Sequence, residues 1–361
     1  MTQATEISNP PAEARRQGVP LWRSIAASTA LQSMVPVVVA LIVGAIIILM
    51  FGNDPLKFYS MVFKRGLLSW VGLQEVLTRM APLLLIAAGL IFCYRAGVWN
   101  LGMDGQFLIG AVLAAYFAVP LAEALPRGVA LGAACAIGAL AGATQTIIPA
   151  WLKIRYGTNE IISSLMMSLL GLSLTSWLIK GPMHDPNSTA VQTVTLPVED
   201  RFPRLFDTYV SSALLLGFVA IVVAHFVMSR TAFGLRLSMV GANRRAAVHA
   251  GLAINRLTAL SFAIGGALTG LAGAVEVTAI AGNVRADENP GYGFAILPLV
   301  FLARFNGWGT LFLTFIYALL LVGGQSASRR MQIPQEFLLV LVGLVLLFTA
   351  ISEVRARRRA R

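Results

Sequence analysis

The sequence is short of charge. Only 12% of its 361 residues are Asp, Glu, Lys or Arg, whereas soluble domains carry about 25%. Hydrophobic residues make up 57% and occur in long runs. With so little polar surface the chain cannot coat a water-soluble globule, which excludes a soluble domain and indicates a lipid environment.

Cysteine, histidine and nucleotide-binding loops are also scarce. Cys93 and Cys135 both lie within apolar runs, so no disulfide framework is implied. His184, His225 and His249 are scattered along the chain, so no metal site is expected. The chain has no glycine-rich loop ending in Lys-Ser or Lys-Thr, the signature of a phosphate-binding loop. We expect no catalytic residue and no cofactor, and any ATP must be bound by another polypeptide.

The formal net charge of +12 does not indicate nucleic-acid binding. Lys and Arg occupy short segments between the apolar runs and a basic C-terminal tail, with no basic face interleaved with aromatic residues. Cations at membrane surfaces have this distribution. The expected surroundings are therefore a lipid bilayer, and nucleic acid is not an expected partner.

The apolar runs define the predicted fold. A helix that crosses a bilayer core of about 30 Å needs about 20 residues. About ten runs approach this length, which predicts an all-α, polytopic membrane protein with about ten transmembrane helices. The second and eighth runs are short for a full span. The runs cover residues 34–51, 80–94, 107–122, 128–151, 160–179, 210–228, 257–281, 292–303, 309–324 and 335–352.

The two ends of the chain are polar. Residues 1–33 are predicted to be a cytoplasmic tail, because no small-residue cleavage site follows the first run. Residues 34–352 then form the transmembrane domain, and residues 353–361 a basic cytoplasmic tail. An even number of spans places both termini in the cytoplasm, and the excess of Lys and Arg in the cytoplasmic segments agrees with this. Arg79 falls in an external segment of this arrangement.

Two connections between runs are long. Residues 180–209 form the largest external segment, which is either a solvated loop or a docking surface for an external solute-binding protein. Residues 229–256 are cytoplasmic in this topology and hold a core of small residues flanked by arginines. They form either an amphipathic helix on the membrane surface or a coupling helix that inserts into a cytoplasmic motor subunit.

Polar residues next to or inside the runs are candidates for a solute path. A carboxylate in hydrocarbon is costly unless it is paired or faces water, so such groups indicate a pathway or a structural pair. Glu276 lies deepest, and its alternative is an interhelical hydrogen bond. For Asp104 and Glu160, at the ends of runs, helix capping is the alternative. The candidates are Asn100, Asp104, Gln106, Asn159, Glu160 and Glu276.

Small residues recur at helical spacing in two runs. Gly138 and Gly142, and likewise Gly266 and Gly270, are four residues apart, which lets two helices approach closely. The surrounding segments are faintly alike, which is a weak indication of two related halves. Generic helix packing explains the same pattern.

Four segments, in order, resemble motifs of one transporter family. Residues 100–118 (NLGMDGQFLIGAVLAAYFA) resemble the Asn-hydrophobic-Gly-x-(Asp/Glu)-Gly-Gln motif of ABC-importer permeases of the branched-chain amino acid and sugar type. Residues 157–170 (GTNEIISSLMMSLL) resemble a Gly-x-Asn-Glu motif of its nucleoside and simple-sugar branch. Residues 234–256 resemble that branch's cytoplasmic segment, and residues 291–310 its Gly-Tyr-Gly-Phe element.

The resemblance implies partners. It predicts a permease that pairs with a second homologous permease as a heterodimer, sits on a cytoplasmic ABC ATPase and receives solute from an external solute-binding protein. Asp104 stands where Glu is commoner, and Ala303 where Gly is frequent, which leaves the class unchanged. The implied ATPase-coupling residues are Gly241, Asn243, Arg244, Ala246, Ala247 and Gly251.

The functional hypothesis is import of a small solute across a bacterial inner membrane by alternating access. Nucleosides are the first expectation, because the motifs resemble that branch most, and a pentose or other simple sugar is the alternative. An ion-coupled secondary transporter is the rival class, and it predicts paired carboxylates or an unwound ion site at mid-membrane. A structural membrane scaffold predicts no polar path.

Overall fold

The fold is built from helices, as expected. The computed structural model describes residues 29–206, 208–334 and 337–359, and in these ranges every apolar run falls on a helix. Residues 1–28 of the expected N-terminal tail lie outside the described part. The helices are α2 (Thr29–Met50), α3 (Pro55–Phe63), α4 (Trp70–Arg95), α5 (Met103–Ala124), α6 (Arg127–Gln145), α7 (Ile147–Tyr156), α8 (Glu160–Lys180), α9 (Ala213–Arg230), α10 (Ala232–Ala242), α11 (Arg244–His249), α12 (Ile254–Val275), α13 (Tyr292–Leu302), α14 (Gly307–Met331) and α15 (Phe337–Arg359), with π-helical η1 (Lys64–Leu68) and η3 (Glu276–Ala281) and the 3₁₀ turn η2 (Val198–Asp200).

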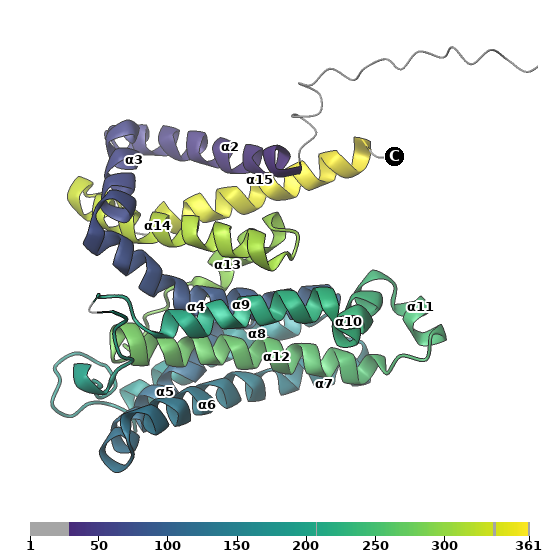
Figure 1. Ribbon diagram of the computed structural model, residues 1–361, viewed down its shortest axis with the longest axis horizontal. Coiled ribbons are helices and arrows are strands. Elements are labelled where there is room, and N and C mark those ends of the chain that lie inside the picture. The colour runs from purple at the N-terminus through teal and green to yellow at the C-terminus, as the bar shows by residue number, and fades with distance from the viewer. Residues whose placement is uncertain (1–28, 207, 335–336, 360–361) are drawn as a thin grey trace, which may run out of the picture.

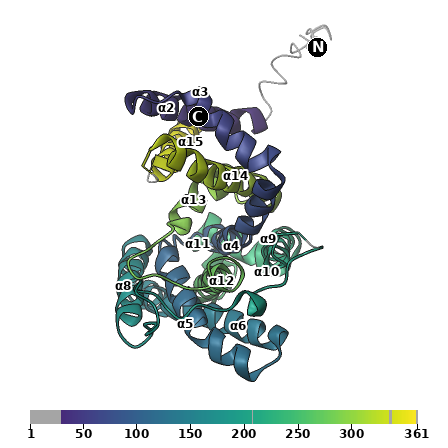
Figure 2. The same cartoon turned by 90° about the vertical axis from the view of Figure 1, so that its left-hand side faces the viewer.

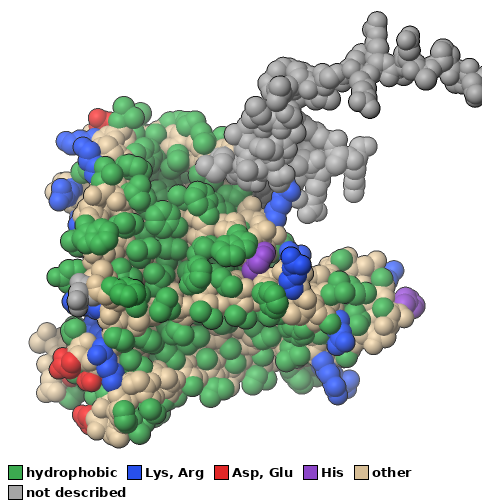
Figure 3. Space-filling model, viewed as in Figure 1, with side chains coloured by type: hydrophobic (Ala, Val, Ile, Leu, Met, Phe, Trp, Pro, Cys, Tyr) green, Lys and Arg blue, Asp and Glu red, His purple; other side chains and the backbone are tan. Residues whose placement is uncertain are grey.

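Helix length and surface composition fit a bilayer. Seven helical segments of the described chain are long and apolar enough to cross a membrane, and α2 and α13 add shorter apolar helices. Hydrophobic side chains cover the visible face between the two ends of the bundle, and charged side chains gather at those ends (Figure 3). The chain is therefore an all-α, polytopic membrane protein.

The helices form two packed groups. Helices α4 to α9 and α12 run side by side in one group, with α10 and α11 at one end of it, and α2, α3, α13, α14 and α15 lie against the group (Figure 1). Seen end-on, α12 lies in the middle of the first group, between α4, α5, α6 and α9 (Figure 2). One continuous cluster of buried apolar side chains, including Phe58, Leu84, Phe262 and Tyr317, extends through both groups.

The two pairs of glycines pack against each other. A Cβ added at Gly270 would lie within 2.8 Å of backbone atoms of Gly142, and one added at Gly142 would collide with the backbones of Gly266 and Gly270. Only glycine lets α6 and α12 approach this closely. The prediction of close helix approach from the glycine spacing is confirmed.

Helix boundaries differ from the apolar runs in several places. Helix α4 begins at Trp70, about ten residues before the expected run, because the Ser69 hydroxyl accepts a hydrogen bond from Gly72 N and caps it. The placement of Arg79 in an external segment was wrong, since Arg79 lies inside α4. The charged stretch 55–68 lies outside the apolar runs and is nevertheless helical, as α3 and η1. Helix α15 continues through much of the expected basic tail, to Arg359.

The segment 180–209 is folded onto the bundle. Residues 191–196 lie antiparallel to residues 282–286, with Thr193 N donating to Val284 O (3.0 Å) and Leu196 N donating to Gly282 O (2.9 Å). Phe202 N donates to Thr278 O at 2.9 Å, which joins the segment to η3. The segment thus covers the end of the bundle opposite α10 and α11 (Figure 1).

Candidate functional site

Glu276 is held by an ion pair between helices. Its Oε1 lies 2.9 Å from Nη1 of Arg79 on α4, and the same Nη1 lies 3.0 Å from the hydroxyl of Tyr292 on α13. Glu276 Oε2 is buried and has no hydrogen-bond partner among the described residues. Glu276 also begins the π-helical turn η3, and such turns are frequent at functional sites. The pair joins α4, η3 and α13.

Asp104 connects the first turns of two helices. It lies near the start of α5, is almost fully buried, and its Oδ1 accepts a hydrogen bond from Gly293 N at 2.8 Å. Gly293 is in the first turn of α13, where backbone N–H groups have no intrahelical acceptor. Asp104 therefore caps α13 from a helix that is 189 positions away in sequence.

Asn100 and Gln106 bond to each other. Two side-chain hydrogen bonds of 3.1 Å join them, and Asn100 Oδ1 also accepts from Gly102 N at 3.0 Å. Both side chains are buried. Next to them, Ser168 Oγ of α8 accepts from Gly105 N at 3.0 Å, which ties α5 to α8. These amides fix the turn before α5.

Asn159 and Glu160 lie at the start of α8. Asn159 Oδ1 accepts from Ile161 N at 3.0 Å and caps the helix. Glu160 Oε2 lies 2.7 Å from Lys153 Nζ on α7, so the carboxylate is paired. The six path candidates are thus spread over three places: the α4–η3–α13 junction, the start of α5, and the start of α8.

The arginine-flanked segment forms two short helices at the end of the bundle where the described C-terminus lies (Figure 1). Asn243 Oδ1 accepts from Ala246 N at 3.1 Å and starts the six-residue α11. Ala247 is 1% exposed, whereas Val248 on the same helix is 58% exposed. The surface that α11 offers to a partner therefore includes Val248 and excludes Ala247.

The remaining coupling candidates have distinct positions. Gly241 is packed against the backbone of Arg95 and Gly97, so a Cβ there would lie 2.8 Å from Gly97 N. Gly251 has φ of +72° and ends the turn after α11. Arg244 and Ala246 are exposed. Helix α11 therefore protrudes from the bundle. Its own Ala247 packs inward, and Gly241, near the end of the preceding helix α10, packs against the bundle.

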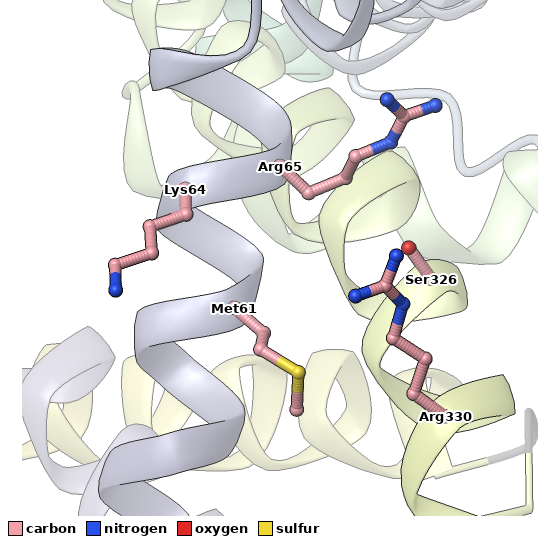
Figure 4. A pocket seen from close by; sticks show the side chains of 5 residues that line it. All are labelled: Met61, Lys64, Arg65, Ser326 and Arg330. Atoms are coloured by element: carbon pink, nitrogen blue, oxygen red, sulfur yellow. The ribbon is translucent and has the colours of Figure 1, made fainter.

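Two cavities lie elsewhere on the described part of the chain. One of about 270 Å³ lies between α5, α8 and residues 285–289. The other, of about 230 Å³, lies between η1 and α14; in the close view the Arg330 guanidinium lies beside Ser326, while Lys64 points away from α14 (Figure 4). None of the six expected path residues lines either cavity.

Sequence reasoning missed the partners of the acidic candidates. Lys153 lies seven residues before Glu160, but nothing in the sequence indicated that the two side chains pair. Tyr292 is 213 positions from Arg79, and only the fold brings them together. Arg79 did give a signal of pairing: an arginine directly before an apolar run, in a protein with a deep Glu276, is a candidate for an intramembrane pair. Among the described residues no group of three or more His, Cys, Asp or Glu is placed to hold a metal ion.

Comparison with known proteins decides the family. Residues 72–350 match the family described as "Branched-chain amino acid transport system / permease component". The chain belongs to this permease family. Its members are membrane subunits of transport systems, so the chain is a permease component and not an enzyme; ATP hydrolysis lies on a separate subunit.

Relatives of this permease cover nearly its whole length. It is 32% identical to the glucose ABC transporter permease protein TsgB13 of Haloferax volcanii over 357 residues, 95% of this chain and 92% of that one. It is 27% identical to the nucleoside ABC transporter permease protein NupB of Lactococcus lactis over 332 residues, 89% and 90% of the two chains. It is also 27% identical to NupC of the same organism over 274 residues, 73% and 86%. No solved structure matches the chain.

Proposed function

We propose that this permease imports nucleosides across the bacterial inner membrane as one subunit of an ATP-driven importer. The observation that carries the proposal is the match, over nearly the full length, to permeases named for nucleosides and for glucose. Both are neutral solutes rich in hydroxyl groups. Nucleosides come first because the motifs at 100–118 and 157–170 resemble the nucleoside branch, and simple sugars are the second candidate.

The proposed mechanism is alternating access. ATP-driven closure of the ATPase would pull α11, and the α10–α12 connection would pass the movement to α12, which lies in the middle of the helices. A solute shifts such an equilibrium only if it binds the two states with different affinity. Release into the cell therefore requires that the inward-facing state binds the solute weakly.

An ATP-driven importer of this kind requires partner proteins. Val248 and the exposed arginines of α11 would contact an ABC ATPase, and the folded segment 180–209 would receive the solute-binding protein. Its exposed apolar side chains Phe206 and Tyr209 favour a docking surface. The matches to both NupB and NupC of one organism support a heterodimer with a second, homologous permease.

An ion-coupled carrier is less well supported by the geometry. Such a carrier needs a carboxylate that releases or binds an ion during the cycle. Glu276 and Glu160 are each paired with a cation, and Asp104 caps α13. These contacts suit structural roles, and the energy source is then the separate ATPase.

Uptake of labelled nucleosides tests the function. Cells with and without the gene are compared with glucose and a pentose as competitors, and with a proton uncoupler while ATP is maintained. The proposal expects gene-dependent nucleoside uptake that survives the uncoupler. Uptake that collapses with the proton gradient would overturn the ATP-driven mechanism, and gene-dependent uptake of sugar alone would overturn the nucleoside assignment.

A further inference from the structure

The cavity of about 270 Å³ has a wall of hydroxyl groups. It lies between α5, α8 and the connection before α13. Its lining includes Leu108, Leu172, Ser173, Thr175, Ser176 and Asn289, and the charged side chains of Arg285, Asp287 and Glu288 complete it. Small-molecule sites occupy about 300–1,000 Å³, so this space, slightly below that range, suits a small solute. It lies toward the end of the bundle covered by segment 180–209, because Ser176 Oγ accepts from Asp287 N, beside the strand-like pair 191–196 and 282–286.

Polar groups in this wall lack partners. Thr175 is 3% exposed, and its hydroxyl has no hydrogen-bond partner among the described residues. Other buried hydroxyls of the described residues also lack a partner, but Thr175 is the one among them that lines either cavity, so a guest there could supply the hydrogen bond. Asn289 uses its Oδ1 to accept from Gly291 N, at 3.0 Å, and its side-chain amide also bonds the Asp104 carboxyl, which leaves one amide N–H group available. The cavity thus offers a hydroxyl and an amide for hydrogen bonding.

The charges around the cavity neutralise one another. Arg285 lies 3.8 Å from Glu288, and Asp287 lies 2.6 Å from Lys180. Hydrogen bonds from Lys180, and then from Ser176, lower the pKa of the Asp287 carboxyl, so it stays ionised and paired at neutral pH. With each charge balanced by a neighbour, the cavity favours a neutral guest over an ion.

The cavity also lies next to the helix junction made by Asp104. Asn289 is in its lining, and four residues further on Gly293 donates to Asp104. On the other side, Ser168 of α8 accepts from Gly105 N. A guest in the cavity therefore contacts the two elements, α8 and the 285–289 connection, that meet at the start of α5.

We propose that this cavity is a binding site for a neutral, hydroxyl-rich solute, with Thr175 and Asn289 bonding its hydroxyl groups and Leu108 and Leu172 packing against its apolar face. The proposal rests on the proposed function and adds to it a place where the solute lies. A nucleoside and a simple sugar share this chemistry, and the experiment separates them.

Solute protection of an introduced cysteine tests the site. Ser173 lines the cavity and is exposed, and the two natural cysteines are buried, so Ser173→Cys adds one reactive thiol with little background. A membrane-impermeant thiol reagent is applied to cells with the complete importer, with guanosine, glucose or no solute. We expect guanosine or glucose to slow modification of Ser173→Cys several-fold. Ser60→Cys, exposed on α3 outside the cavity, is the matched control and should react equally with and without solute.

A second variant removes the buried hydroxyl while keeping its shape. Thr175→Val should weaken solute protection of Ser173→Cys by about five- to tenfold, the effect of losing one hydrogen bond to a buried partner. Ser163→Ala on the same helix, outside the cavity, should leave it unchanged. Equal reactivity of Ser173→Cys with and without either solute, in cells that import the solute, would overturn the site and leave the proposed function standing. Absence of import would instead count against the proposed function.

Discussion

At the scale of single residues, the acidic candidates are tied to specific partners. The sequence singled out Glu276, Asp104 and Glu160 because carboxylates are costly in hydrocarbon, and that argument was sufficient to find them. It could not supply the partners. Arg79 comes from a helix 197 positions away and Gly293 from one 189 positions away. Such pairings depend on the packing of whole helices, which local patterns do not contain.

The Arg79–Glu276 pair gives a prediction about stability. Replacing Arg79 by Leu leaves Glu276 unpaired in the bundle and should destabilise the protein by about 3–5 kcal/mol. The double variant Arg79→Leu with Glu276→Leu should recover much of that loss, because no charge remains buried. Thermal unfolding of the purified permease measures both. Losses that simply add in the double variant would show that the two side chains do not act as a pair.

At the scale of helices, the apolar runs located the spans but misplaced some ends. Helix α4 extends over Gln74, Glu75 and Arg79, which lie before the apolar run that begins at residue 80. These polar residues are tolerated because each has a partner: Gln74 Oε1 accepts from Tyr209 N at 2.9 Å, and Glu75 lies 3.6 Å from Arg65. Hydropathy averages over a window and does not register pairing, so it begins the helix too late at this place.

Close packing of α6 on α12 gives a second prediction. Gly142→Leu places a side chain where the backbone of α12 lies, and overpacking of this kind costs about 1–3 kcal/mol. Gly132→Leu on the same helix is the control, because a Cβ there meets nothing within 4 Å. The comparison is made by thermal unfolding and by the yield of folded protein. Equal stability of the two variants would contradict the close contact.

The exposed side of α11 gives a third prediction, which concerns coupling. Val248→Glu should abolish solute-stimulated ATP hydrolysis and uptake while the permease stays folded, because the side chain is outside the bundle. Val248→Ala is the matched control and should keep most activity. Ala247→Glu should instead reduce folded protein, since Ala247 is buried. Normal transport by Val248→Glu would rule out α11 as the ATPase contact.

At the scale of the whole molecule, the class of an all-α polytopic membrane protein was predictable, whereas the cavity was not. Composition and run length suffice for a polytopic membrane protein, and the motifs at 100–118 and 157–170 correctly indicated the permease family. The cavity joins α5, α8 and the connection before α13, three segments that sequence spacing does not bring together. Its hydroxyl residues Ser173, Thr175 and Ser176 lie within α8, and nothing in the sequence distinguishes them from other polar residues of a helix.

The arrangement of the molecule in the membrane gives a fourth prediction. Segment 180–209 and α11 lie at opposite ends of the bundle (Figure 1). If α11 faces the cytoplasm, an impermeant thiol reagent should label Ser60→Cys in intact cells and Val248→Cys only after permeabilisation. The wild-type chain, with both cysteines buried, gives the background. Labelling of Val248→Cys in intact cells would invert the proposed topology.

Helix α13 also has a consequence for biosynthesis. Its 11 residues extend about 16 Å at about 1.5 Å per residue, roughly half of a bilayer core. It is too short to cross the core by itself, and α14, which follows it, is long enough to do so. Asp104 is synthesised long before α13. Until α13 has been made, the Asp104 carboxylate lacks the hydrogen bond that Gly293 N donates to it. Completion of the permease therefore depends on its last third reaching back to a residue inserted early.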